Sequence, residues 1–254
     1  MMYALDYSTS KNLYRHTLYL QIADIIAQNS VAIRAQVGAI IVKNGQIISD
    51  GYNGMPTNFD NCCEHIESDG NIMSNKEVLH AESNALMKLC RLGGFACNDA
   101  TLYCNYSPCF DCAKLIIQSG IKSIFFSNIY HGINGLQLCI DANIKCTLII
   151  DATNYSQLVD LSICIANNIE LFKHVTIVLH NLSENAMHKF KSLFNNNCNV
   201  IWLFTTRNTF LLFKDMPHSS IIAIYDNSIF NAHFHDSYLS QLNLQKYDSN
   251  PCNL

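Results

Sequence analysis

The stretch ATLYCNYSPCFDCAKLIIQSGIKSIFF, residues 100–126, decides the fold of this 254-residue chain. Its first apolar run, 100–106, predicts a strand, and Pro108 marks the turn that follows. Residues 110–119 have the apolar spacing of a helix, which a glycine ends, and 121–126 predict a second strand. A strand, a helix and a strand in this order are typical of an α/β layer architecture.

The same alternation extends to both sides of this stretch. Before it, the pattern predicts a helix over 12–27, strands over 36–43 and 46–52 joined by an Asn-Gly hairpin turn, and a helix over 79–92. After it, the pattern predicts a helix over 135–142 and a strand over 144–150. Residues 53–75 are rich in Asn, Asp, Gly and Ser and predict a long loop, a kind of segment that is often functional.

A second, smaller α/β unit is expected in residues 151–254. Helices are expected over 157–166 and 184–194, and strands over 175–179, 200–204 and 221–225. The length lies between one and two domains of roughly 150 residues each, so we expect a first domain in residues 1–150 and a boundary near Asp151. No motif of the second unit indicates a chemistry, and its role stays unassigned.

The composition favours a folded chain that binds a small ligand. The chain has 49% hydrophobic and 14% charged residues and a net charge of −4, which argues against disorder and against a broad basic surface for nucleic acid. No run of about 18 apolar residues predicts a membrane span, and residues 1–16 lack the apolar core of a secretory signal. We therefore expect the twelve cysteines to be thiols in a reducing compartment, the cytoplasm, with neither membrane nor nucleic acid as a partner.

Two short motifs supply a set of metal ligands. His80-Ala-Glu82 stands at the expected start of one helix, and Pro-Cys109-Phe-Asp-Cys112 at the start of the next. One imidazole and two thiolates leave the fourth tetrahedral position of Zn²⁺ open for water, as in a catalytic site. Glu82, two residues from the histidine, is placed to move protons without binding the metal. A Cys-x-x-Cys pair alone could be half a zinc knuckle or a redox pair, but the combination is the signature of zinc nucleobase deaminases.

Over about residues 12–150 the chain resembles the deoxycytidylate (dCMP) deaminases. The resemblance is carried by VGAII at 37–41, IISDGYNGMP at 47–56, HAESNA at 80–85, SPCFDCAK at 107–114 and GI at 120–121. It implies a cytidine deaminase-like fold, in which a mixed sheet forms the middle of three α/β/α layers. The Gly-Tyr-Asn-Gly segment and the Asn-Ala after His-Ala-Glu favour this branch over the tRNA adenosine deaminases.

The resemblance also implies a reaction. A water activated by Zn²⁺ attacks C4 of cytosine, while Glu82 takes its proton, protonates N3 and later passes a proton to the departing amino group. The products are dUMP, which feeds thymidylate synthesis, and ammonia. Three alternatives stay open: another cytosine or adenine derivative as substrate, from a nucleoside to tRNA; a structural zinc; and a non-catalytic protein that senses nucleotides.

Four residues are candidates for substrate contacts. By resemblance, Asn53 lies in the loop that reaches the sugar, with a residue that only shapes a turn as the alternative. Arg34 is a candidate for the 5′-phosphate, with a solvated surface arginine as the alternative. Ser107 either bonds the base edge or caps the following helix. Tyr130 either packs beside the nucleotide or belongs to the core.

Regulation and a second metal site are weaker expectations. Family members often respond to nucleoside triphosphates at the Gly-Tyr-Asn-Gly segment, here Gly51, Tyr52, Asn53 and Gly54, so dCTP and dTTP are candidate effectors of a homo-oligomer, with a hexamer as the form considered. Cys62, Cys63 and His65 raise a second zinc site, but a structural site needs four ligands, and we favour its absence. His233 and His235 are interpreted as part of a solvated turn.

Overall fold

The computed structural model describes most of the first 180 residues and two short strands beyond them. The described residues are 7–91, 93, 97–151, 160–161, 163–165, 167–172, 174–180, 199–204 and 223–224. The helix expected over 184–194 and the turn at His233 and His235 lie outside them. Within the described part, no helix combines the length and the apolarity that crossing a bilayer requires.

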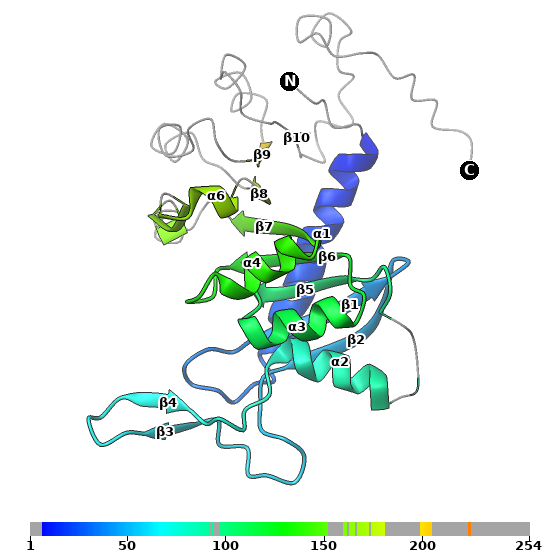
Figure 1. Ribbon diagram of the computed structural model, residues 1–254. Helices are drawn as coiled ribbons and strands as arrows, with labels where there is room; N and C mark the ends of the chain where they lie inside the picture. The colour runs from blue at the N-terminus through cyan, green and yellow to red at the C-terminus, as the bar shows by residue number, and fades with distance from the viewer. Residues whose placement is uncertain are drawn as a thin grey trace, which may run out of the picture.

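One mixed sheet forms the centre of the molecule (Figure 1). Its strand order is β10-β9-β8-β7-β6-β5-β1-β2. The strands are β1 Gly38–Lys43, β2 Gln46–Tyr52, β5 Thr101–Tyr106, β6 Ser123–Asn128, β7 Lys145–Asp151, β8 Val175–His180, β9 Asn199–Phe204 and β10 Ala223–Ile224. β1 runs antiparallel to both β2 and β5, whereas β5 to β10 are parallel to one another.

Helices cover both faces of this sheet. The helices of the deaminase-like segment are α1 Tyr7–Ala27, α2 Ala81–Arg91, α3 Phe110–Gln118 and α4 Asn134–Asp141. Side chains alternate along a strand, so Ile40 of β1 packs in one cluster with Leu20 of α1, while Ile41 packs in the other with residues of α2, α3 and α4. The expected three α/β/α layers are confirmed.

Two glycines let helices approach the sheet closely. A Cβ on Gly38 would lie 2.1 Å from the Ala23 carbonyl oxygen of α1, and a Cβ on Gly51 would lie 2.4 Å from the Ala81 carbonyl oxygen of α2. Real Cβ atoms do not approach backbone so closely, so only glycine allows these contacts. The second contact fixes α2, the helix that carries Glu82, against β2.

The long loop after β2 contains a hairpin that the sequence did not predict. β3, Glu64–Ile66, pairs antiparallel with β4, Ile72–Ser74, and the two form a separate sheet that projects from the body (Figure 1). Gly70 has a φ of 84° in the connecting turn, a conformation that glycine adopts without strain. Three-residue strands give too short an apolar pattern to stand out among polar neighbours.

The parallel sheet continues beyond residue 150. Cys146 to Asp151 of β7 pair with Val175 to His180 of β8. Short helix α6, Ile169–Phe172, precedes β8, and Phe172 and Ile177 belong to the same apolar cluster as Leu148. The strands expected over 175–179 and 200–204 are thus found, as part of the sheet of the first unit. The domain boundary near Asp151 stays a prediction.

Candidate metal centre

The two predicted ligand motifs meet at the starts of α2 and α3. His80 directly precedes α2, and Cys109 is the N-cap residue of α3, with its Sγ accepting a hydrogen bond from the Cys112 backbone N–H at 3.5 Å. Gly54 exchanges backbone hydrogen bonds of 3.1 and 2.9 Å with Leu79. This bridge fixes the residue next to His80, so the imidazole enters the site from an anchored backbone.

The three donor atoms have the spacing that Zn²⁺ requires. His80 Nδ1 lies 3.3 Å from Cys109 Sγ and 3.5 Å from Cys112 Sγ, and all three donors lie within 4.8 Å of one another. Zn–S bonds of about 2.3 Å and Zn–N bonds of about 2.0 Å give tetrahedral edges of about 3.5 Å between S and N and about 3.8 Å between two S atoms. One imidazole and two thiols therefore fit a zinc ion with a fourth position left open.

The electrostatics of the two thiols favour a cation between them. The pKa of the Cys109 thiol is lowered to about 4, first by the hydrogen bond from the Cys112 side chain and also by those from His80 and the Cys112 backbone. The Cys112 thiol shares this interaction, and its pKa is raised by the Cys109 contact and by burial. Cys109 therefore deprotonates readily, whereas Cys112 does not deprotonate beside a Cys109 thiolate. A divalent cation between the two sulfur atoms would supply the positive charge that stabilises a second thiolate.

Glu82 is a buried carboxyl beside these donors. Its side chain lies in the first turn of α2, only 4% of the residue is exposed, and burial raises its pKa, an effect that the nearby His80 partly opposes. An acidic group whose pKa moves toward neutrality both accepts and returns protons efficiently near pH 7. Its position and its pKa suit proton transfer at the metal centre.

A cavity of about 320 Å³ opens over Glu82, His80 and Cys109. A cavity of this size is in the range of small-molecule sites. All four residues expected to contact the substrate line it: Arg34, Asn53, Ser107 and Tyr130. The structure thus brings together the predicted ligands and the predicted contacts, whereas the role of each residue stays a prediction.

Local hydrogen bonds define how two of these residues are held. Asn53 Oδ1 accepts from the Val37 N–H at 2.8 Å, and its Nδ2 donates to the Ala35 carbonyl at 2.9 Å. Ser107 Oγ accepts from the Tyr130 N–H at 2.9 Å. Since Cys109 is the N-cap of α3, the alternative interpretation of Ser107 as the helix cap is wrong. Its hydroxyl hydrogen remains available to a ligand.

The cavity also contains residues that sequence reasoning missed. Lys76, Ser74 and Glu64 line it from the β3–β4 hairpin and the residues just after it. Arg34 Nη1 donates to Ser74 Oγ at 3.2 Å. Among the described residues, neither Arg34 nor Lys76 is part of an ion pair. The composition of the long loop indicated function, but only the hairpin explains which of its side chains reach the cavity.

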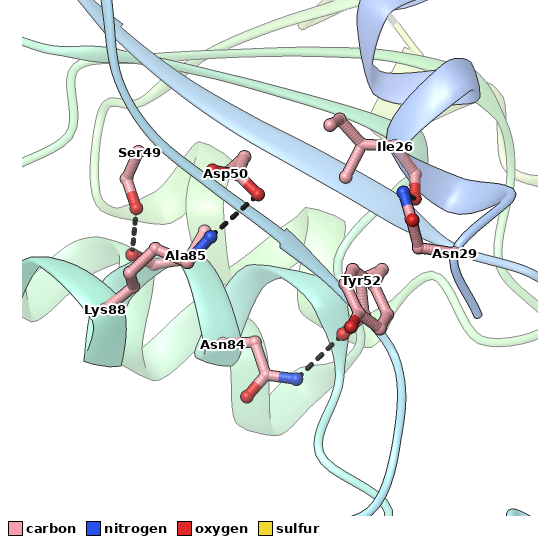
Figure 2. Close-up of polar contacts among 8 residues, drawn as sticks. All are labelled: Ile26, Asn29, Ser49, Asp50, Tyr52, Asn84, Ala85 and Lys88. Carbon is pink, nitrogen blue, oxygen red and sulfur yellow. Dashed lines mark hydrogen bonds and ion pairs between the residues drawn. The ribbon is translucent and has the colours of Figure 1, made fainter.

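The Gly51–Gly54 segment is joined to α2 (Figure 2). The Tyr52 carbonyl accepts from Asn84 Nδ2 at 2.7 Å, and one turn further along the helix Lys88 Nζ lies 2.8 Å from Asp50 Oδ2. Ser49 Oγ donates to the Ala85 carbonyl at 2.7 Å. The segment therefore orients the helix that carries Glu82, while its expected role in effector binding stays a prediction.

Cys62, Cys63 and His65 point to separate neighbours. Cys62 Sγ lies 3.3 Å from the Glu64 carbonyl, and His65 Nδ1 lies 2.7 Å from Asn75 Oδ1. Cys63 Sγ lies 4.0 Å from an asparagine oxygen. Within the described ranges, the group of metal-ligating side chains that converge is His80, Cys109 and Cys112.

Comparison with known proteins shows the family of this chain. A family model for the cytidine and deoxycytidylate deaminase zinc-binding region matches residues 14–128. The fold and the three-donor site thus define a zinc-dependent deaminase. The deoxycytidylate deaminase of Enterobacteria phage T4 is 34% identical over 148 residues, an alignment that covers 44% of this chain and 76% of the relative. The chain belongs to the deoxycytidylate deaminase family, as its motifs predicted.

Two further relatives have similar identity. The human deoxycytidylate deaminase is 38% identical over 121 residues, covering 44% of this chain and 65% of the relative. The crystal structure of the dCMP deaminase from cyanophage S-TIM5 in complex with dCMP and dUMP is 39% identical, covers 50% of this chain and 91% of that chain, and has a TM-score of 0.47.

Proposed function

We propose that this chain hydrolyses dCMP to dUMP and ammonia at the metal centre. The observation that carries the proposal is the buried Glu82 carboxyl beside three zinc donors, in a cavity that also contains Arg34 and Lys76. Relatives named for this activity support it.

His80, Cys109 and Cys112 would hold the zinc. When bound, Zn²⁺ supplies a water whose pKa is lowered to about 7 and which can attack C4 of the cytosine ring. Glu82 accepts the proton of the attacking water and delivers it to N3. It then accepts the second proton of that oxygen and passes it to the amino group, so that the C4–N bond breaks as ammonia leaves and C4 keeps the oxygen as a carbonyl. Burial of Glu82 keeps bulk water from competing for these protons.

The substrate contacts are part of the same proposal. Arg34 and Lys76 are two cations that suit a 5′-phosphate. Glu64 lines the same cavity, where its Oε1 accepts the backbone N–H groups of Ile33 and Arg34 at 3.0 and 3.3 Å. The Ser107 hydroxyl would donate to the base edge. Tyr130, a residue that is 40% exposed and lines the cavity, would pack its ring against the nucleotide, and Asn53 would face the sugar.

A substrate panel tests the proposal. Ammonia release is measured with dCMP, dCTP, cytidine, deoxycytidine and cytosine, and we expect the highest kcat/KM for dCMP. A preference for deoxycytidine over dCMP would contradict the phosphate contacts, and no product from any compound would contradict the activity itself.

We further propose that the active form is a homo-oligomer, with a hexamer as the first form to test, and that it responds to dCTP and dTTP. The link between the Gly51–Gly54 segment and α2 supports an effect of ligands there on Glu82. The same assay, repeated with each triphosphate, should show opposite effects on the dependence of rate on dCMP. We also propose a cytoplasmic location, which the free thiols of the ten described cysteines support.

A further inference from the structure

Two asparagine side chains hold the segment that precedes β1. Asn53 bonds the Ala35 carbonyl and the Val37 N–H from one side. Asn105 bonds the Gln36 carbonyl and the Gly38 N–H from the other, each at 3.1 Å. Successive peptide groups of an extended chain point to opposite sides, so each amide meets one donor and one acceptor. The two amides thus extend the pairing of β1 with its neighbours, together with the Asn53 backbone N–H, which donates to the Val37 carbonyl at 3.1 Å.

Asn105 makes these bonds where the β1–β5 ladder ends. Ala39 is paired with Cys104, and the same antiparallel register places Asn105 opposite Gly38. Instead of its backbone, its side chain bonds residues 36 and 38. The backbone carbonyl oxygen of Asn105 accepts hydrogen bonds from Asn128 Nδ2 at 2.8 Å and from Ser127 Oγ at 3.1 Å. The residue is 7% exposed, so it ties the segment to both β5 and β6 from a buried position.

The segment that Asn105 holds is a wall of the cavity. Arg34, Ala35 and Val37 line the cavity, and so do Tyr106 and Ser107, which directly follow Asn105, whereas Asn105 itself is not among the lining residues. We propose that Asn105 is a positioning residue, which fixes this wall and with it the Arg34 side chain in the geometry that binds the nucleotide phosphate. The proposal rests on the proposed function only for the identity of the ligand.

The test compares three variants of the full chain. Asn105→Ala removes both amide bonds and also the side-chain contact with Asp24 of α1. Asn105→Ser keeps a hydroxyl that can still bond one of the two backbone groups. Asn29→Ala is the control: its Nδ2 also donates to a backbone carbonyl, that of Ile26 at 3.1 Å (Figure 2), but Asn29 does not line the cavity. For each variant we would measure zinc content, kcat and KM for dCMP, KM for deoxycytidine, and hydrogen exchange of the Val37 and Gly38 amides without nucleotide.

For Asn105→Ala we expect the zinc content of the parent and a kcat within about threefold of the parent value. The KM for dCMP should rise about tenfold, which corresponds to the loss of one or two hydrogen bonds. The KM for deoxycytidine, which has no phosphate, should change less. Gly38 should exchange faster than in the parent, Asn105→Ser should lie between the two, and Asn29→Ala should match the parent. If Asn105→Ala does not fold, Asn105→Ser carries the same test.

A parent-like KM for dCMP in a folded, zinc-loaded variant would overturn the proposal. So would a loss of zinc and kcat at unchanged KM, because Asn105 would then act on the metal centre. If the Gly38 amide exchanged at the parent rate in Asn105→Ala, that result alone would show that Asn105 does not hold the segment before β1. Hydrogen exchange is measured without substrate, so it tests the positioning role of Asn105 even if the parent enzyme does not deaminate dCMP. A failure of the positioning role is therefore distinguishable from a failure of the proposed function.

Discussion

At the scale of single residues, burial and chemistry conflict at Glu82. A carboxyl that is 4% exposed loses the hydration of its charged form, and the resulting rise of its pKa lowers the stability of the folded chain at neutral pH. A protein selected only for stability would place an apolar or amide side chain there. The cost is explained if the group must carry a proton next to the metal.

Replacement of Glu82 by glutamine separates these two effects. Glu82→Gln keeps the shape but cannot accept a proton, so kcat for dCMP should fall by at least about 100-fold, the lower end of general acid-base effects. Zinc content by elemental analysis should stay at the parent value, and the midpoint of thermal unfolding should not fall. Glu77→Gln, at an exposed position of the loop before α2, is the matched control. A variant that works at the parent rate would remove Glu82 from the mechanism.

The sequence predicts those functional residues whose chemistry requires a fixed spacing along the chain. His80, Glu82, Cys109 and Cys112 are such residues, because each pair is separated by one or two positions at a helix start. Asn105 and Lys76 gave no such signal. The contribution of Asn105 depends on a carbonyl and an N–H 69 and 67 positions away in the chain, and no local pattern encodes that pairing.

At the scale of elements, the close contact of β2 with α2 positions the catalytic helix. Gly51 approaches the α2 backbone at both Ala81 and Ala85, and these two residues flank the turn that contains Glu82. Helices α1 to α4 and the long strands were predictable, since their apolar runs span several residues, whereas the four-residue helix α6 was not predicted. The hairpin β3–β4 was not, because its exposed three-residue strands bury no apolar face that would leave a pattern.

Gly51→Ala should therefore damage the site through the helix. The added Cβ would lie 2.4 Å from the Ala81 carbonyl oxygen and 2.5 Å from the Ala85 nitrogen, so α2 must shift. We expect a loss of about 1–3 kcal/mol in the free energy of unfolding and a weaker hold on zinc, measured by urea denaturation and by competition with a chelator. Gly132→Ala, whose Cβ would meet nothing within 4 Å, is the control. Equal zinc affinity in the two variants would show that β2 does not position α2.

At the scale of the whole molecule, the layer between α1 and the sheet contains a neutral histidine. His16 Nδ1 lies 2.6 Å from the Tyr103 hydroxyl, and its ring stacks on Phe125 with centroids 4.0 Å apart. Burial lowers the pKa of His16 to about 4, with a smaller effect from Arg15, and burial raises the pKa of Tyr103. The phenol thus stays protonated and shares a hydrogen bond with the neutral imidazole. This contact joins α1 to the centre of the sheet.

The stability of the fold should consequently depend on pH through His16. The ordinary pKa of 6.5 applies in the unfolded chain and a pKa of about 4 in the folded one, so the unfolded chain binds the proton more strongly. The contribution is complete above pH 6.5 and is lost as the pH falls from 6.5 toward 4, by up to about 3 kcal/mol. Urea denaturation at pH 7.5 and pH 5.0 measures this loss.

His16→Phe keeps an aromatic ring between Tyr103 and Phe125 but removes the titrating group. Other groups, such as Glu82 and the zinc ligands, titrate in both proteins, so the difference between parent and variant isolates His16. We expect the parent to lose about 1–2 kcal/mol more than the variant between pH 7.5 and pH 5.0, since most of the shift from 6.5 is sampled by then. At pH 7.5 the variant should be less stable, because the Tyr103 hydroxyl loses its partner. Equal losses in the two proteins would mean that α1 is not joined to the sheet through a neutral histidine.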